Sequence, residues 1–130
     1  MNMEERAKEA VELKNTPGIN CCQAVAMALA DETPFDREQM RQLGAGFGGG
    51  MGTMEGTCGA LVGAGMVAGL KSGGSGTQKL TRQMAGSFKQ TCGAVTCKDI
   101  KGVATGKVLC SCDDCVKNAV LIYSDVMGED

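Results

Sequence analysis

Residues 57–69 read TCGALVGAGMVAG, a run headed by one cysteine and free of charged and aromatic side chains. Its glycines form two pairs spaced four residues apart, Gly59 with Gly63 and Gly65 with Gly69. Small residues at this spacing let two helix backbones approach closely, so the run predicts a helix in close contact with a neighbour. That neighbour is either another helix of the chain or a second copy in a homodimer. The run is too short to span the roughly 30 Å hydrocarbon core of a membrane.

Helical patterning continues on both sides of this run. Apolar residues recur at helical spacing, between polar or glycine-rich turns, in residues 4–15, 20–31, 36–43, 57–71, 77–91 and 111–127. Strand-like alternation is limited to residues 103–109. The length of 130 residues suits one domain. We therefore expect a single domain over residues 1–130 with an all-α fold, a compact bundle of about five helices with glycine-rich turns.

The composition restricts both the core and the chemistry. Aromatic residues make up 3% of the chain, with no Trp and one Tyr, while nine residues are Met, so the core must consist mainly of Ala, Val, Leu and Met. The net charge of −2 gives no reason to expect nucleic acid or an anionic membrane as a partner. The chain has no histidine, which removes the commonest acid–base catalyst and metal ligand. We therefore assign no catalytic residue and expect any metal to be bound by sulfur or carboxylate.

Eight residues are cysteine, a high number for this length. The sequence begins MNMEERAKEAVELKN, which lacks the apolar segment of a secretory signal, so we expect a cytoplasmic protein. A cytoplasmic chain with many cysteines points to metal binding or redox chemistry more than to a disulfide scaffold.

Four cysteines share a sequence context. A residue that often caps helix N-termini comes directly before each of them, as Asn20-Cys21, Thr57-Cys58, Thr96-Cys97 and Ser111-Cys112. A thiol in the first turn of a helix lies beside unpaired backbone N–H groups and the positive end of the helix dipole, which favour the thiolate that binds metal. The sequence therefore predicts a metal site formed by Cys21, Cys58, Cys97 and Cys112.

Other interpretations of the cysteines stay open. Cys92 and Cys115 also follow residues that cap helices, and any single cysteine beside a cap is often only a small buried apolar residue. A thiol–disulfide relay through Cys92 and Cys97, or through Cys110 and Cys115, is a further alternative.

Two motifs that suggest other functions lack the context they need. GAGFGG at residues 44–49 matches G-x-G-x-x-G, but it follows a helical segment where a nucleotide site requires a strand, so we interpret it as a tight turn. CSCDDC at residues 110–115 contains C-x-x-C, yet a thioredoxin-like site needs a βαβ unit. Its two aspartates also oppose a lowered thiol pKa through like-charge repulsion.

Five short segments occur together in one order: NCCQAV at 20–25, FGGGMG at 47–52, CGALVG at 58–63, CKDIKG at 97–102 and CDDCV at 112–116. In this set the chain resembles the C_GCAxxG_C_C family of redox-active proteins, over about residues 18–126. Carried over by motif, the four cysteines of the family fall on Cys21, Cys58, Cys97 and Cys112. The other thiols, which look like additions of this sequence, are Cys22, Cys92, Cys110 and Cys115. The resemblance implies a small helical bacterial protein, whose cysteines serve redox chemistry or hold an iron–sulfur cluster and whose gene often lies near transporter genes.

Three hypotheses follow from the residues and the resemblance. The first is a metal–thiolate protein for electron transfer or redox sensing with a redox partner protein, whose iron–sulfur cluster is bound by Cys21, Cys58, Cys97 and Cys112. The second is a metal-free thiol–disulfide redox protein. The third is a structural Cys₄ zinc module that binds a partner, for which the resemblance suggests a transporter.

Overall fold

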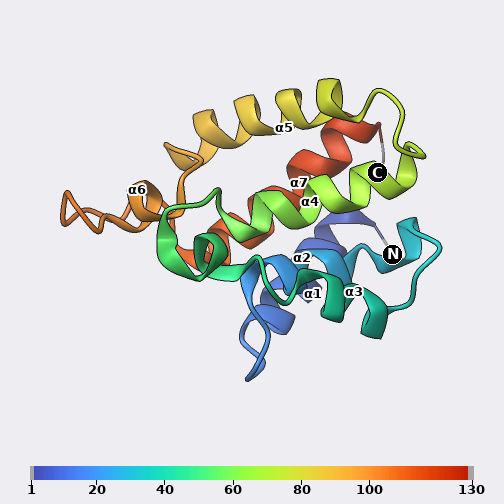
Figure 1. The fold of residues 1–130 in the computed structure, drawn as a ribbon, viewed down its shortest axis with the longest axis horizontal. Coiled ribbons are helices and arrows are strands. Elements are labelled where there is room, and N and C mark those ends of the chain that lie inside the picture. The colour runs from blue at the N-terminus through green and yellow to red at the C-terminus, as the bar shows by residue number, and fades with distance from the viewer. Residues whose placement is uncertain (1, 129–130) are drawn as a thin grey trace.

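The computed structural model describes residues 2–128 as a chain of helices (Figure 1). The α-helices are α1 (Met3–Lys14), α2 (Cys21–Ala28), α3 (Arg37–Gly44), α4 (Gly59–Lys71), α5 (Thr77–Cys92), α6 (Cys97–Lys101) and α7 (Cys112–Met127). A 3₁₀ turn, η1 (Ala30–Glu32), follows α2, and a π turn, η2 (Gly50–Met54), precedes α4. The all-α class is confirmed, whereas the expected count of about five helices is too low for the described part of the chain.

The predicted number of helices is too low because a helix of about one turn has too few residues to show a helical pattern of apolar side chains in the sequence. α6 has five residues and lies in a segment whose sequence shows no apolar stripe. Residues 103–109, where strand-like alternation occurs, form turns instead, and the Leu109 N–H donates to the Ile100 carbonyl at 2.8 Å. Between residues 2 and 128, β-type pairing is limited to one isolated bridge between Thr57 and Thr96.

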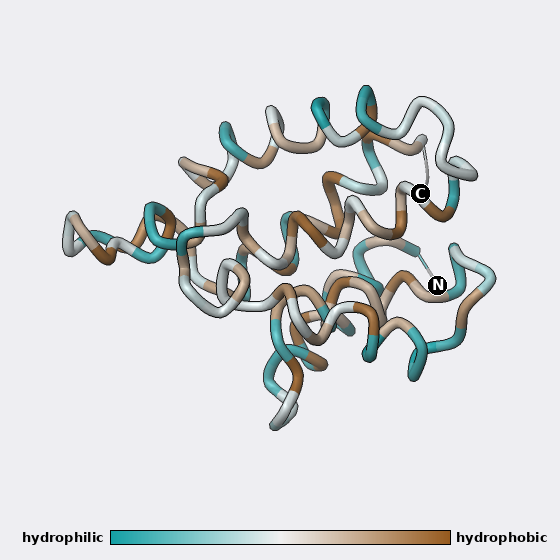
Figure 2. The backbone as a smooth tube through the Cα atoms, in the orientation of Figure 1, coloured by the Kyte–Doolittle hydropathy of each residue, from teal (hydrophilic) through white to brown (hydrophobic). Residues whose placement is uncertain are grey.

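The helices form three layers (Figure 1). α4 and α7 lie in the middle, α5 covers one side, and α1, α2 and α3 cover the other. α2 packs on α4, α1 packs on α7, and α5 packs on both middle helices. Figure 2 shows hydrophobic residues along the middle helices and hydrophilic residues on the outer turns of α5. No helix of the described part of the chain is long and apolar enough to cross a membrane.

The core has the composition that the sequence predicts. The largest fully buried side chains are Tyr123, Phe88, Leu29, Met40, Met84 and Ile100. Met84 and Phe88 lie four residues apart in α5 and are both fully buried, and α5 packs on α7. One face of α5 is therefore apolar, as helical periodicity requires. Alanines of α1, α2, α4 and α7 fill much of the remaining core.

The glycines of the opening run set the distance between α4 and α2. A Cβ atom at Gly63 would lie 2.8 Å from the Cys22 carbonyl oxygen, and one at Gly59 would lie 2.8 Å from the Phe47 carbonyl oxygen. Both distances are too short for a real contact, so only glycine fits without movement. The close neighbour predicted for residues 57–69 therefore lies within the chain.

Candidate thiol and metal site

Seven of the eight cysteines interact with one another at one end of the bundle, on the left in Figure 1. The starts of α2, α4, α6 and α7 meet here with the end of α5 and the loop before α7. The eighth, Cys22, is fully buried between α2 and α4, where its Sγ lies 3.6 Å from the Met66 Sδ and its thiol interacts electrostatically with Cys58 alone among the cysteines. All eight cysteines are free thiols.

Two of the predicted caps hold the helices that carry Cys21 and Cys112. The Asn20 side chain accepts a hydrogen bond from the Gln23 N–H of α2 at 2.8 Å, and the Ser111 side chain caps α7 in the same way at 3.1 Å. Cys21 and Cys112 are the first residues of these helices. The sequence therefore predicted the positions of both thiols correctly.

The Cys21 and Cys112 thiols contact each other. Cys21 donates a hydrogen bond to the Cys112 sulfur, and this bond, together with the ammonium groups of Lys101 and Lys14, lowers the pKa of Cys112 to about 5. The same bond and burial raise the pKa of Cys21. The interaction therefore favours the thiolate at Cys112 and the protonated thiol at Cys21.

Cys58 and Cys97 lie on two segments joined by the isolated bridge. The backbone N–H groups of the two cysteines donate across the bridge to carbonyl oxygens, at 2.8 Å from Cys58 and 2.9 Å from Cys97. Thr57 takes part in this bridge, so its predicted role as a cap is wrong, and Cys58 itself occupies the cap position of α4. Thr96 occupies the cap position of α6 without a side-chain hydrogen bond to the helix.

The surroundings of Cys58 favour its thiolate. A hydrogen bond from Cys115 is the main cause that lowers the pKa of Cys58 to about 7, although burial opposes it. The backbone N–H groups of Ala60 and Leu61 and the charge of Lys101 lower this pKa further. These N–H groups belong to the first turn of α4, which agrees with the predicted effect of a helix start on a thiol.

The four predicted ligands form a ring of interacting thiols. Cys21 interacts electrostatically with Cys112 and Cys58, and Cys97 interacts with Cys58 and Cys112. Three of them are buried and Cys112 is half-buried. Each also interacts with the positive charge of Lys14 or Lys101. The fold thus brings four cysteines, each at the start of a different helix, into one region.

A second group of thiols lies beside this ring. The Sγ atoms of Cys92, Cys110 and Cys115 all lie within 4.8 Å of one another, and in residues 2–128 this is the one group of three cysteine or carboxylate ligands that is so compact. It contains none of the four predicted ligands. Cys115 connects the two groups through its hydrogen bond to Cys58.

Sequence reasoning did not predict this second group as a site. Its members are the last residue of α5, a residue in the loop before α7 and a residue inside the first turns of α7, so no shared capping pattern unites them. A partial signal exists in the C-x₄-C spacing of Cys110 and Cys115 across a helix start. The contribution of Cys92 depends on how α5 packs on α7, which the local sequence does not encode.

The glycine-rich loop before α4 packs against Cys97. A Cβ atom at Gly50 would lie 2.8 Å from the Cys97 Cβ, so the loop backbone approaches this thiol more closely than any other residue type would allow. The loop has a left-handed backbone from Gly49 to Gly52, including Met51 at a φ of 62°. A methionine in this conformation is uncommon and strained. The Met51 side chain is 59% exposed and does not cover the thiols.

One surface hollow opens onto the ring. It is lined in part by Cys21 and Cys112, with Lys14 and Arg41 at its edge. Cys112 is half-buried and lines this hollow, so we expect a small reagent to approach its thiol from this side.

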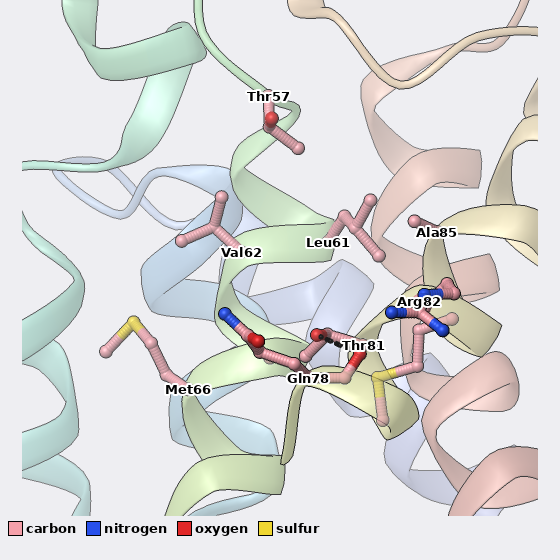
Figure 3. A pocket seen from close by; sticks show the side chains of 10 residues that line it. Thr57, Leu61, Val62, Met66, Gln78, Thr81, Arg82 and Ala85 are labelled. Carbon is pink, nitrogen blue, oxygen red and sulfur yellow. Dashed lines mark hydrogen bonds between the residues drawn. The ribbon is translucent and has the colours of Figure 1, made fainter. Parts of the chain in front are cut away.

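A separate groove runs between α4 and α5 (Figure 3) and has a volume of about 730 Å³. Leu61, Val62 and Met66 line it from α4, and Thr81 and Arg82 line it from α5. No cysteine lines this groove. The face of α4 that follows Cys58 in helical phase is therefore only partly buried in the core.

Comparison with known proteins gives one match. A family model described as "Putative redox-active protein (C_GCAxxG_C_C)" matches residues 19–126. Neither the curated proteins nor the solved structures gave a match.

Proposed function

The chain belongs to the C_GCAxxG_C_C family, and from this premise we propose that it is a redox-active metal–thiolate protein. In this proposal an iron–sulfur cluster is held by Cys21, Cys58, Cys97 and Cys112. The observation that carries it is the ring in which each of these thiols interacts with two of the others. Thiolates are the usual ligands of such clusters, and a histidine-free chain offers no competing imidazole.

The surroundings of the ring fit an anionic cluster. Four thiolates bring four negative charges, which the ammonium groups of Lys14 and Lys101 offset in part. Backbone N–H groups at the start of α4 point at the Cys58 sulfur, and hydrogen bonds of this kind tune the potential of a cluster. The backbone of the Gly50 loop packs closely against the Cys97 side chain without a bulky side chain of its own. A bound cluster would supply one-electron transfer, which neither Lys nor Cys side chains alone provide.

A second candidate function is metal-free thiol–disulfide exchange, and the Cys21–Cys112 contact favours it. The Cys112 thiolate would attack a disulfide of a partner protein and release one partner thiolate. The Cys21 thiol, after loss of its proton, would then attack the mixed disulfide and release the second partner thiol. The partner gains two electrons, one proton from Cys21 and one proton from solvent, and a Cys21–Cys112 disulfide remains.

The decisive experiment is anaerobic expression with iron supplied, followed by visible absorbance and by iron, zinc and sulfide analysis. We expect a coloured protein that contains iron and sulfide. Zinc without colour would indicate the Cys₄ zinc module instead. A colourless, metal-free protein would exclude both metal hypotheses and favour disulfide exchange, which mapping of a Cys21–Cys112 disulfide after treatment with oxidised dithiothreitol would then test.

Single serine variants assign the ligands. Serine at Cys21, Cys58, Cys97 or Cys112 should abolish retention of iron. Cys22→Ser is the matched control, because Cys22 follows Cys21 directly but contacts Met66. Far-ultraviolet circular dichroism of each variant checks that it folds. Equal loss of iron in Cys22→Ser and in the four ligand variants would contradict the assignment.

A further inference from the structure

The second thiol group has the geometry of a metal site of its own. Cys92 and Cys115 are fully buried and Cys110 is half-buried, with all three Sγ atoms within 4.8 Å of one another. Three thiolates around one ion with metal–sulfur bonds of about 2.3 Å lie about 3.8–4.0 Å apart, whether the arrangement is tetrahedral or trigonal. The three sulfurs therefore reach a ligating arrangement by moving less than about 1 Å.

Two polar side chains are directed at these sulfurs. The Asn118 amide donates to the Cys92 Sγ at 3.5 Å and lies 4.0 Å from the Cys110 Sγ. The Lys101 ammonium lies 3.5 Å from the Cys115 Sγ and donates to the Cys110 carbonyl oxygen at 3.0 Å. Groups that hydrogen-bond metal ligands orient them and stabilise the bound form.

The charges around the group identify the class of ion. Three thiolates and one divalent ion carry a net charge of −1, which the Lys101 ammonium neutralises. Thiolate sulfur is soft and selects ions such as Zn²⁺ and Cu⁺, and related closed-shell ions, over Mg²⁺ or Ca²⁺. With two of the three ligands fully buried, little room is left for the water ligands that hard ions keep.

We propose that Cys92, Cys110 and Cys115 form a second metal site that binds one thiophilic closed-shell ion. In this site Lys101 supplies the neutralising charge and Asn118 orients two of the sulfurs. The site is distinct from the proposed cluster ligands, since it shares no cysteine with them. Cys115 and Lys101 interact with both groups, so variants at Cys92 and Cys110 separate the second site from the ring.

The test uses Cd²⁺ as the probe, because its bonds to thiolates produce an ultraviolet charge-transfer band. The reduced, metal-free chain carries Cys21→Ser and Cys97→Ser, so that the ring lacks two of its thiols. We expect this variant to bind one equivalent of Cd²⁺ tightly. Adding Cys92→Ser and Cys110→Ser should remove that equivalent, whereas adding Cys22→Ser should not. An unchanged stoichiometry after loss of Cys92 and Cys110 would overturn the proposal.

Lys101 provides a finer comparison within the same background. Lys101→Met should weaken Cd²⁺ binding about 10-fold, as loss of a group that supports metal ligands typically does. Lys98→Met is the matched control, because Lys98 lies on the same short helix but is exposed. Equal affinities of the two variants would contradict the role of Lys101.

A labelling experiment on the unmutated protein does not depend on the folding of variants. Cys110 is half-buried, so iodoacetamide should alkylate it in the metal-free protein. Two equivalents of Cd²⁺, enough for both thiol groups, should protect it, as read by peptide mass spectrometry. Alkylation of Cys110 at the metal-free rate would overturn the proposal. Iron retention in the Cys92→Ser/Cys110→Ser variant tests the ring separately.

Discussion

The contact between α4 and α2 at Gly63 leads to a quantitative prediction. A Cβ atom at Gly63 would lie 2.8 Å from the Cys22 carbonyl oxygen and 3.2 Å from the Val25 Cβ. A backbone carbonyl within a helix cannot rotate away as a flexible side chain can. Gly63→Ala must therefore push α4 and α2 apart, and α2 carries Cys21 at its start.

Gly69→Ala is the matched control within the same helix. A Cβ atom there would lie 3.8 Å from the Thr77 Cγ2, an ordinary van der Waals distance. Both substitutions gain the same helix propensity, about 1 kcal/mol for alanine over glycine. Overpacking at Gly63 costs about 1–3 kcal/mol. The unfolding free energy of Gly63→Ala should therefore lie about 1–3 kcal/mol below that of Gly69→Ala.

Urea unfolding of the reduced, metal-free protein, followed by circular dichroism, measures both values. In a domain of this size about 1 kcal/mol corresponds to about 4 °C in Tm, so thermal unfolding should separate the two variants by about 4–12 °C. Gly69→Ala should be slightly more stable than the unmutated protein. If the two variants unfold at the same urea concentration with the same m-value, the close α2–α4 packing argued from Gly63 is refuted.

Three further predictions concern single contacts. Asn20→Ala removes the cap of α2 and should lower the unfolding free energy by about 1 kcal/mol, whereas Asn20→Asp keeps a capping oxygen; equal loss in both would contradict the capping role. Tyr123→Phe removes a part-buried hydrogen bond of 3.1 Å from the tyrosine hydroxyl to the Glu32 carboxylate and should cost about 1–3 kcal/mol in the same assay. An unchanged urea midpoint would argue against that bond. In the metal-free protein the neighbouring groups lower the pKa of Cys112 to about 5. Its alkylation by iodoacetamide should therefore be nearly independent of pH between about 6 and 8. An ordinary thiol reacts about 10-fold faster per pH unit in this range. Cys21→Ala removes the main hydrogen-bond donor to Cys112, so the pKa of Cys112 should rise and its alkylation near pH 6 should slow; an unchanged rate there would contradict the pairing.

Helical periodicity and capping residues allowed the long helices to be predicted from the sequence. The apolar stripe that contains Met84 and Phe88 placed α5 correctly, and Asn20 and Ser111 marked the starts of α2 and α7 because their side chains satisfy backbone N–H groups locally. The same criterion wrongly predicted Thr57 as a cap, because Thr57 pairs with Thr96 in a strand-like bridge and Cys58 occupies the cap position of α4. A capping residue in sequence does not exclude such a tertiary partner.

The thiols also differ in whether their positions depend on the local sequence or on the packing of distant helices. The positions of Cys21 and Cys112 were predictable, because each depends on a local cap. The group of Cys92, Cys110 and Cys115 was not, because it joins the end of one helix to the start of another through the packing of α5 on α7. Periodicity shows which face of a helix is buried but not which residue of another helix it meets.

The arrangement of α6 indicates that the thiols contribute to the fold. α6 and the following turn project from the bundle (Figure 1), and Val103 and Val108 in this turn are about 60% exposed. The segment is anchored by the Thr57–Thr96 bridge, by Cys97 against Gly50 and by Lys101 against Cys110 and Cys115. The segment is also held by Ile100, which is fully buried in the core. Metal bound through these cysteines would add folding free energy at this end of the bundle.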